Sequence, residues 1–132
     1  MNKESIISFL KDNGMDDIEE IKFNDKVLVF RFFFDFDDDE LNAAKAYAND
    51  ECEEDEESEA WYEEFYLPYL SDLAVDNVGD ILEELMEELE ISSQFISYNV
   101  EKESSEYSEI VAIFHEEDEE VEIEKILDEL NI

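Results

Sequence analysis

The strongest constraint on the fold is an alternating apolar run from Val27 to Phe36. Every second residue in it is Leu or Phe, namely Leu28, Phe30, Phe32, Phe34 and Phe36. A period of two places these side chains on one face of a β-strand. The opposite face carries Val29 and Phe33 beside Arg31, so both faces need at least partial cover. The run therefore predicts the central strand of a sheet.

Shorter periodic segments surround this strand. Helical spacing of apolar residues predicts helices over 6–10, 40–48, 61–73, 78–89 and 123–130. Strands are predicted over 18–23, 94–100 and 108–115, with a turn at Asn24-Asp25. Two β-hairpins forming an antiparallel sheet, with helices packed mainly on one side, make an α+β domain.

Polar residues mark the expected element ends. Asn13-Gly14 ends the first helix, and Asp37-Asp38-Asp39 caps the second. Asn49–Glu59 is almost entirely acidic and is predicted to be a mobile loop. Pro68 is expected to kink or restart the helix around it, and Asp76-Asn77 to cap a separate helix.

The chain is predicted to be one domain, 1–132, in which an α-β-β-α order occurs twice. The halves are 1–50 and 76–132, and an acidic loop and an aromatic helix over 51–75 join them. At an offset of 75, Ile6, Leu10 and Ile21 meet Ile81, Leu85 and Ile96. Chance also produces matches in a chain rich in apolar and acidic residues, so a true pseudo-repeat and an accidental likeness both stay open.

The net charge is −35, from 43 acidic and 8 basic residues. Between Ala46 and Glu101 nineteen residues are acidic and none is Lys or Arg. Like charges oppose compaction, yet 44% of the residues are hydrophobic and only two are Gly, which favours a folded chain over a disordered one. The sign of the charge disfavours direct binding to nucleic acid or anionic membranes. We expect a basic protein partner.

Cellular location is predicted from absent signals. No apolar run reaches the ~18 residues of a membrane span, and Met1–Ser5 lacks the basic start of a signal peptide. The single cysteine, Cys52, cannot form an internal disulfide. These features predict a cytoplasmic protein.

No motif predicts catalysis or a cofactor. The sole Cys and the sole His, Cys52 and His115, fall on different predicted elements, and there is no glycine-rich phosphate loop or Cys/His metal cluster. Asp35, Asp37 and Asp39 match the first ligands of an EF-hand loop. Glu40 and Ala46, however, replace the glycine and the final acid of that loop, so we interpret the pattern as a strand end entering a helix cap. We expect no enzyme, no dedicated metal site and only diffuse attraction of Ca²⁺ or Mg²⁺. An enzyme using a carboxylate pair stays a minor alternative.

Charge concentrates in Asp35–Glu40, Asp50–Glu64 and Glu116–Glu124. Acids at helical spacing form a negative ridge, which suits a surface evolved for the phosphate backbone. Aromatic residues among acids also suit arginine. We therefore predict a nucleic-acid mimic or an immunity-type inhibitor of a nucleic-acid-binding protein or nuclease. The predicted contact residues are Asp50, Glu51, Glu53, Glu54, Asp55, Glu56, Glu57, Glu59, Trp61, Tyr62, Glu63, Glu64, Tyr66, Glu116, Glu117, Asp118, Glu119 and Glu120.

The aromatic residues of this set allow two interpretations. Trp61, Phe65 and Tyr69 recur every four residues, so they form either part of the core or an interface stripe. Tyr62 and Tyr66 are expected to be the more exposed members. Arg31 is expected to pair with a neighbouring acid.

In size, acidity and alternation of helices with hairpins, the chain resembles type III secretion chaperones. That resemblance covers most of the chain and implies an acidic adaptor, a homodimer whose apolar grooves hold a partner segment. The third strand usual in that family is missing after Phe36. The other alternative is an acidic domain whose charge serves only solvation.

Overall fold

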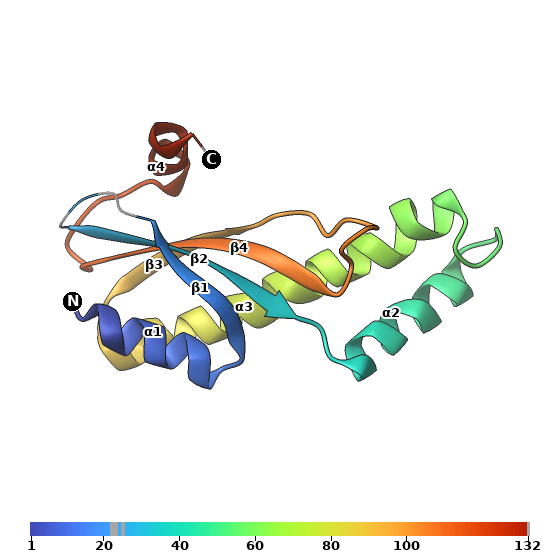
Figure 1. Cartoon of the computed structure of the whole chain (residues 1–132), viewed down its shortest axis with the longest axis horizontal. Coiled ribbons are helices and arrows are strands. Elements are labelled where there is room, and N and C mark those ends of the chain that lie inside the picture. The colour runs from blue at the N-terminus through green and yellow to red at the C-terminus, as the bar shows by residue number, and fades with distance from the viewer. Residues whose placement is uncertain (22–23, 25, 132) are drawn as a thin grey trace.

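The computed structural model describes residues 1–21, 24 and 26–131. The elements are α1 (Lys3–Asp12), β1 (Met15–Ile21), β2 (Val27–Asp35), α2 (Asp38–Glu51), the π-helix η1 (Trp61–Tyr66), α3 (Leu67–Leu89), β3 (Ser92–Ser97), β4 (Tyr107–His115) and α4 (Ile123–Leu130) (Figure 1). The four strands form one antiparallel sheet in the order β1-β2-β4-β3. The predicted α+β class is confirmed.

The alternating run occupies the centre of the sheet. β2 pairs with β4 along its whole length, from Val27 opposite His115 to Asp35 opposite Tyr107. β1 pairs with the other edge of β2, with an irregular register between Asp16 and Glu19. Phe23, predicted to belong to the strand over 18–23, and Asp25, predicted to belong to the following turn, lie outside the described residues.

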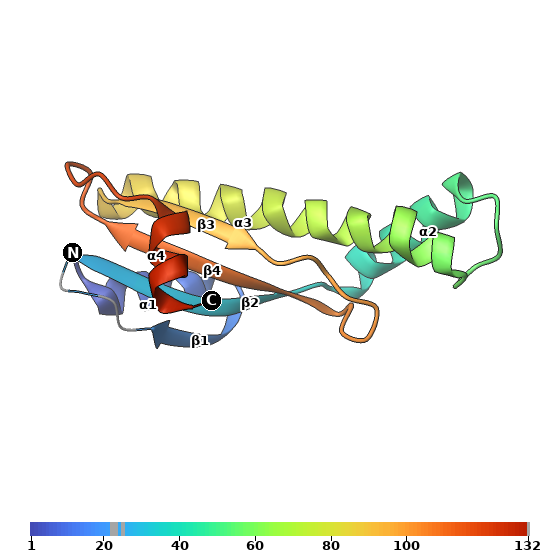
Figure 2. The same cartoon turned by 90° about the horizontal axis from the view of Figure 1, so that it is seen from above.

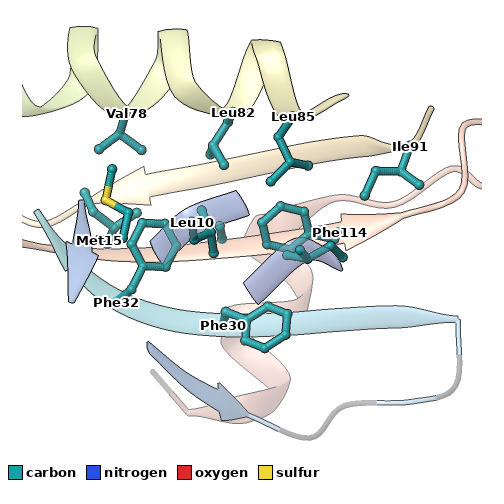
Figure 3. Close-up of a cluster of buried hydrophobic side chains, with 12 residues drawn as sticks. Leu10, Met15, Phe30, Phe32, Val78, Leu82, Leu85, Ile91 and Phe114 are labelled. Atoms are coloured by element: carbon teal, nitrogen blue, oxygen red, sulfur yellow. The ribbon is translucent and has the colours of Figure 1, made fainter. Parts of the chain in front are cut away.

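The main core lies between the sheet and the helices α1 and α3. Phe30 and Phe32 point from β2 towards Leu82 and Leu85 of α3, with Phe114 beside them (Figure 3). The rings of Phe30 and Phe114 meet edge to face at 5.8 Å between centroids. The apolar period of two in β2 therefore meets the 3.6-residue period of α3 across one buried layer.

α4 packs on the opposite face of the sheet and covers only part of it (Figure 2). Its Ile126 and Leu127 lie against Val29 and Val111. Gln94 of β3 fixes its start: the Gln94 side chain donates to the Val121 carbonyl at 2.6 Å and accepts from the Ile123 amide at 3.2 Å. Among the described residues, no helix covers the remainder of this face.

A helical arm, residues 38–74, extends beyond the sheet. It consists of α2, the connection 52–60, η1 and the first part of α3 (Figures 1 and 2). A second buried cluster holds it together: Phe36, Ala44, Ala48, Trp61, Tyr66, Leu70, Ala74 and Val100. The two alanines of α2 allow close approach to the bulky side chains of η1, so the arm has a core of its own.

Two element boundaries differ from the predictions. Asn49, Asp50 and Glu51 belong to α2, so the acidic connection begins only at Cys52. α3 is unbroken from Leu67 to Leu89, and the helix start predicted at Asp76-Asn77 is wrong. Both residues fit a continuing helix, because Asp76 is exposed and the Asn77 side chain donates to Glu40 of α2. Burial of Ala74 and Val78 on either side continues one helix from the arm into the main core.

Several predicted end signals are confirmed. Asn13 is the C-cap of α1, and Gly14 has a φ of 86°, a conformation open to glycine. Asp37 is the N-cap of α2 and forms a capping box with Glu40. Regular α-helical bonding is interrupted just before Pro68, by η1.

The pseudo-repeat is not confirmed. The two hairpins occupy equivalent places in the sheet, but α2 extends away from it, whereas α4 folds back onto it. Ile6 is also buried, while its predicted equivalent Ile81 is half-buried. No helix within the described ranges is long and apolar enough to cross a membrane.

Candidate acidic binding surface

The two predicted contact stretches lie at opposite ends of the molecule. Asp50–Glu64 forms the tip of the arm, whereas Glu116–Glu120 lies in the link between β4 and α4, beyond the far end of the sheet (Figures 1 and 2). The structure does not bring them together into one surface. They are candidates for separate contacts.

The tip presents its acids on a rigid aromatic support. Its acidic side chains, Asp50, Glu51, Glu53, Glu54, Asp55, Glu56, Glu57, Glu59, Glu63 and Glu64, are all exposed. Beneath them Trp61 is only 1% exposed, and its indole N–H donates to Asn49 at 2.9 Å. The Trp61 ring stacks on Tyr66 at 4.7 Å between centroids. This packing joins η1 to the end of α2.

The expected exposure of Tyr66 is wrong, because Tyr66 is only 5% exposed. The prediction assumed a period of 3.6 residues, which puts Trp61, Phe65 and Tyr69 on one face. In a π-helix the hydrogen bonds run from i to i+5, so Trp61 and Tyr66 share the buried face instead. Trp61 and Tyr66 thus form core, and Phe65 and Tyr69 are half-buried around Tyr47 of α2.

Tyr62 is the aromatic residue of the tip that still faces outward in part. The Lys102 ammonium group lies 4.9 Å from the centroid of its ring. Burial, the charges of Glu57 and Glu56 and a hydrogen bond with Glu57 raise the pKa of Tyr62. Its ring therefore already holds a cation in a negative environment.

A further acidic surface, on α3, was not predicted from the sequence. Asp72, Asp76, Asp80, Glu83, Glu84, Glu87 and Glu88 are all exposed, and we call them the α3 ridge. They lie opposite the buried stripe that contains Val78 and Leu82. Over the ~24 Å from Asp72 to Glu88 the charges follow one another at an average axial spacing of about 4 Å, close to the ~3.4 Å between charges along one strand of duplex DNA. The spacing of three and four residues was visible in the sequence, but the predicted helix break at Asp76-Asn77 divided it.

Ion pairing separates the arm and the α3 ridge from the link. Lys26 lies 3.7 Å from Glu119 and Lys125 lies 3.4 Å from Glu122, so the chain's own cations partly neutralise the link. Among the described residues, none of the ion pairs uses an acid of the arm tip or of the α3 ridge. The two surfaces lie on consecutive elements, η1 and α3, but no acid lies between Glu64 and Asp72. Lys102 lines a hollow together with Glu63 and Asp72 at this junction.

The residues considered for chemistry are far apart or serve as caps. Cys52 follows α2 on the arm, and His115 ends β4 near the link. Asp37 caps α2 and Asp39 lies in its first turn, as predicted for a strand end entering a cap. Within the described residues, no three His, Cys, Asp or Glu side chains are grouped to hold a metal ion. Comparisons of the chain with protein-family models, with curated proteins and with solved structures find no match.

Proposed function

We propose that the protein acts without catalysis, as an acidic binding protein that occupies the nucleic-acid-binding surface of a basic protein. The partner would be a nucleic-acid-binding protein or a nuclease, and binding would inhibit it by charge mimicry. The observation that carries this proposal is the α3 ridge, whose exposed and unpaired charges have about the axial spacing of one DNA strand.

The arm tip adds a second group of unpaired acids on the element that precedes α3. The sequence has no Lys or Arg between Ala46 and Glu101, and Lys102 approaches the tip at the Tyr62 ring. Complementary charge speeds encounter with a basic partner and opposes wrong partners. The link is the weaker candidate of the two predicted stretches, since Lys26 and Lys125 already pair with it.

The chaperone alternative has less support. It requires an apolar groove for a partner segment. The large apolar side chains that are exposed among the described residues are instead spread over the N-terminus, α2, α3 and β4, as Met1, Tyr47, Val75 and Tyr107. Repulsion between two chains of net charge −35 also opposes a homodimer.

Three variants with equal charge changes test the mimicry. Each replaces five acids by Asn or Gln: the ridge variant at Asp72, Asp76, Asp80, Glu83 and Glu87, the tip variant at Glu53, Glu54, Asp55, Glu56 and Glu57, and the link variant at Glu116, Glu117, Asp118, Glu119 and Glu120. Wild type and variants serve as baits in a lysate of the source organism, washed at about 50 and about 300 mM salt, a range over which screening shortens the reach of surface charge. Captured proteins are then tested for displacement of bound DNA or RNA by the wild-type chain.

Mimicry predicts one basic partner retained at the higher salt, lost with the ridge variant, weakened with the tip variant and kept with the link variant. The wild-type chain then displaces nucleic acid from this partner. Equal capture by the ridge variant contradicts the proposal, as does a mixed set of basic proteins that all leave at the higher salt.

A further inference from the structure

The face of the sheet opposite α3 is only half covered. α4 packs over Val29, Val111 and Ile113, towards one end of the strands (Figure 2). Beyond it, strand pairing places Phe33 opposite Glu109, and Asp35 opposite Tyr107. No helix of the part of the chain that the structure describes covers this half of the face, although it carries large aromatic side chains.

Acidic and aromatic residues alternate across this open half. Asp16 of β1 pairs with Phe33, Phe33 with Glu109, and Glu109 accepts the amide of Tyr98. Because paired residues of neighbouring strands point to the same face, these four side chains form a row across the strands in which carboxylates alternate with aromatic rings. Each ring therefore has a carboxylate beside it.

A hollow of about 440 Å³ lies in this row, lined in part by Arg31, Phe33, Tyr98, Tyr107 and Glu109. The rings of Phe33 and Tyr107 meet edge to face at 5.3 Å between centroids. Tyr107 is 40% exposed, and the Tyr98 hydroxyl is covered but has no hydrogen-bond partner among the described residues. An unpaired hydroxyl costs free energy that an entering donor would recover.

Arg31 displays the geometry that this row offers to a cation. Its guanidinium carbon lies 5.8 Å from the Phe33 ring centroid, and its Nε lies 3.4 Å from a Glu109 oxygen. The predicted pairing of Arg31 with a neighbouring acid is thereby confirmed. Arg31 is thus held between an aromatic ring and a carboxylate. The rings of Tyr98 and Tyr107 and the carboxylate of Asp16 do not contact Arg31 in this way and stay available to a second cation.

We propose that this open half of the sheet is a second binding surface, which takes an arginine side chain from a segment of a basic protein. Arg31 faces an excess of acids in Asp16, Asp35, Glu101 and Glu109, so the surface attracts positive charge. A second copy of the chain would bring the same excess of acids and be repelled. Arginine fits better than lysine, because its planar group stacks on a ring while its N–H groups bind a carboxylate.

This surface and the α3 ridge lie on opposite sides of the sheet, so the proposal does not depend on the one made for the α3 ridge. The test uses a short arginine-rich peptide and a lysine-rich peptide of equal length and charge, titrated into the full chain. NMR signals of the Tyr98 and Tyr107 rings report on the sheet face, and the fluorescence of Trp61, the sole tryptophan, reports on the arm. The variants are Tyr107→Leu alone and Phe33→Leu with Tyr107→Leu. Tyr47→Leu is the matched control, because Tyr47 is 41% exposed, nearly the same as Tyr107.

We expect the arginine-rich peptide to shift the Tyr98 and Tyr107 signals and to bind more tightly than the lysine-rich peptide. Tyr107→Leu should weaken arginine-peptide binding about fivefold and the double variant about tenfold or more, with the arginine preference lost. Tyr47→Leu and the ridge variant should keep the preference. If the double variant does not fold, Tyr107→Leu alone decides.

Three results would overturn this proposal. The first is no change in the Tyr98 and Tyr107 signals, and the second is equal losses with Tyr107→Leu and Tyr47→Leu. The third is a dimer in sedimentation that Tyr107→Leu dissociates, which would assign the open half of the sheet to a second copy of the chain. None of the three bears on the α3 ridge and the arm tip, which are tested by the ridge and tip variants.

Discussion

Asp35 shows, at the scale of a single residue, how the fold accommodates its negative charge. It ends β2 opposite Tyr107, and its pKa is raised to about 6 from an ordinary value of 3.8. The main cause is a hydrogen bond with Asp16, followed by burial and by repulsion from Asp16 and Asp17. Below that pH the two carboxyl groups share a proton, and above it they repel each other.

The raised pKa predicts a stability that falls as the pH rises. The folded chain holds the Asp35 proton more tightly than the unfolded chain, so this contribution is complete below about pH 3.8 and lost as the pH passes about 6. Asp35→Asn keeps a hydrogen-bonding group towards Asp16 but cannot ionise. Urea unfolding between pH 5 and pH 7 should therefore show a smaller loss of stability in Asp35→Asn than in wild type. Asp76→Asn, which removes one charge from the α3 ridge, should keep the wild-type slope, and equal slopes in all three proteins would contradict the assignment.

At the scale of elements, the arm depends on how α2 begins. Asp37 accepts the Glu40 amide at 2.8 Å, and one Glu40 oxygen accepts the Asp37 amide at 3.0 Å. The other Glu40 oxygen accepts from Asn77 of α3 at 3.1 Å. The cap of α2 is thus also its attachment to the helix beside it.

Removing the cap should loosen the arm. Asp37→Ala is expected to lower the free energy of unfolding by about 1 kcal/mol, the usual cost of losing an N-cap. Asp39→Ala removes the same charge from the first turn of the same helix without removing the cap, so it should cost clearly less. Thermal and urea unfolding followed by circular dichroism measure both, and equal effects would mean that charge at the helix start, not the cap, stabilises α2.

Local signals made most elements predictable from the sequence. The period of two in Val27–Phe36, the glycine after Asn13 and the capping residue Asp37 each act within a few residues of themselves. The continuity of α3 could not be predicted this way, because Asp76-Asn77 resembles a helix N-cap in the sequence. The helix continues because Ala74 is buried in the core of the arm and Val78 in the core of the sheet, and this burial involves residues far away in the chain. The exposure of Tyr66 was mispredicted because a π-helical turn has no sequence period that the 3.6-residue rule detects.

At the scale of the whole molecule, the sequence could suggest acidic stretches but not their relative places. The arm tip and the link are separated by the length of the molecule, and only the structure reveals that Lys26 and Lys125 form ion pairs with acids of the link. The unpaired charges of the α3 ridge repel one another along the helix. Like charges three or four residues apart each cost about 0.2–0.5 kcal/mol.

This repulsion predicts that two equal charge changes stabilise the fold to different extents. At low salt the free energy of unfolding of the ridge variant should be about 1–2 kcal/mol higher than that of wild type, because the variant removes several like-charge pairs. The link variant should gain less, since it also loses the pairing of Glu119 with Lys26. Melting temperatures in about 20 mM and about 1 M NaCl measure this, and the advantage of the ridge variant should vanish at high salt, where the Debye length is ~3 Å. An advantage that persists at high salt would show that repulsion is not its cause.

α3 belongs to both hydrophobic cores, with Leu70 and Ala74 in that of the arm and Leu82 and Leu85 in that of the sheet. A single helix anchored at both ends does not swing relative to the body it is packed on. The acidic surface is therefore held in one geometry, and under the proposed function its association with a partner would lose little conformational entropy. Such a partner would have to match this fixed shape or change its own, so the protein would act as a template to which its target adapts.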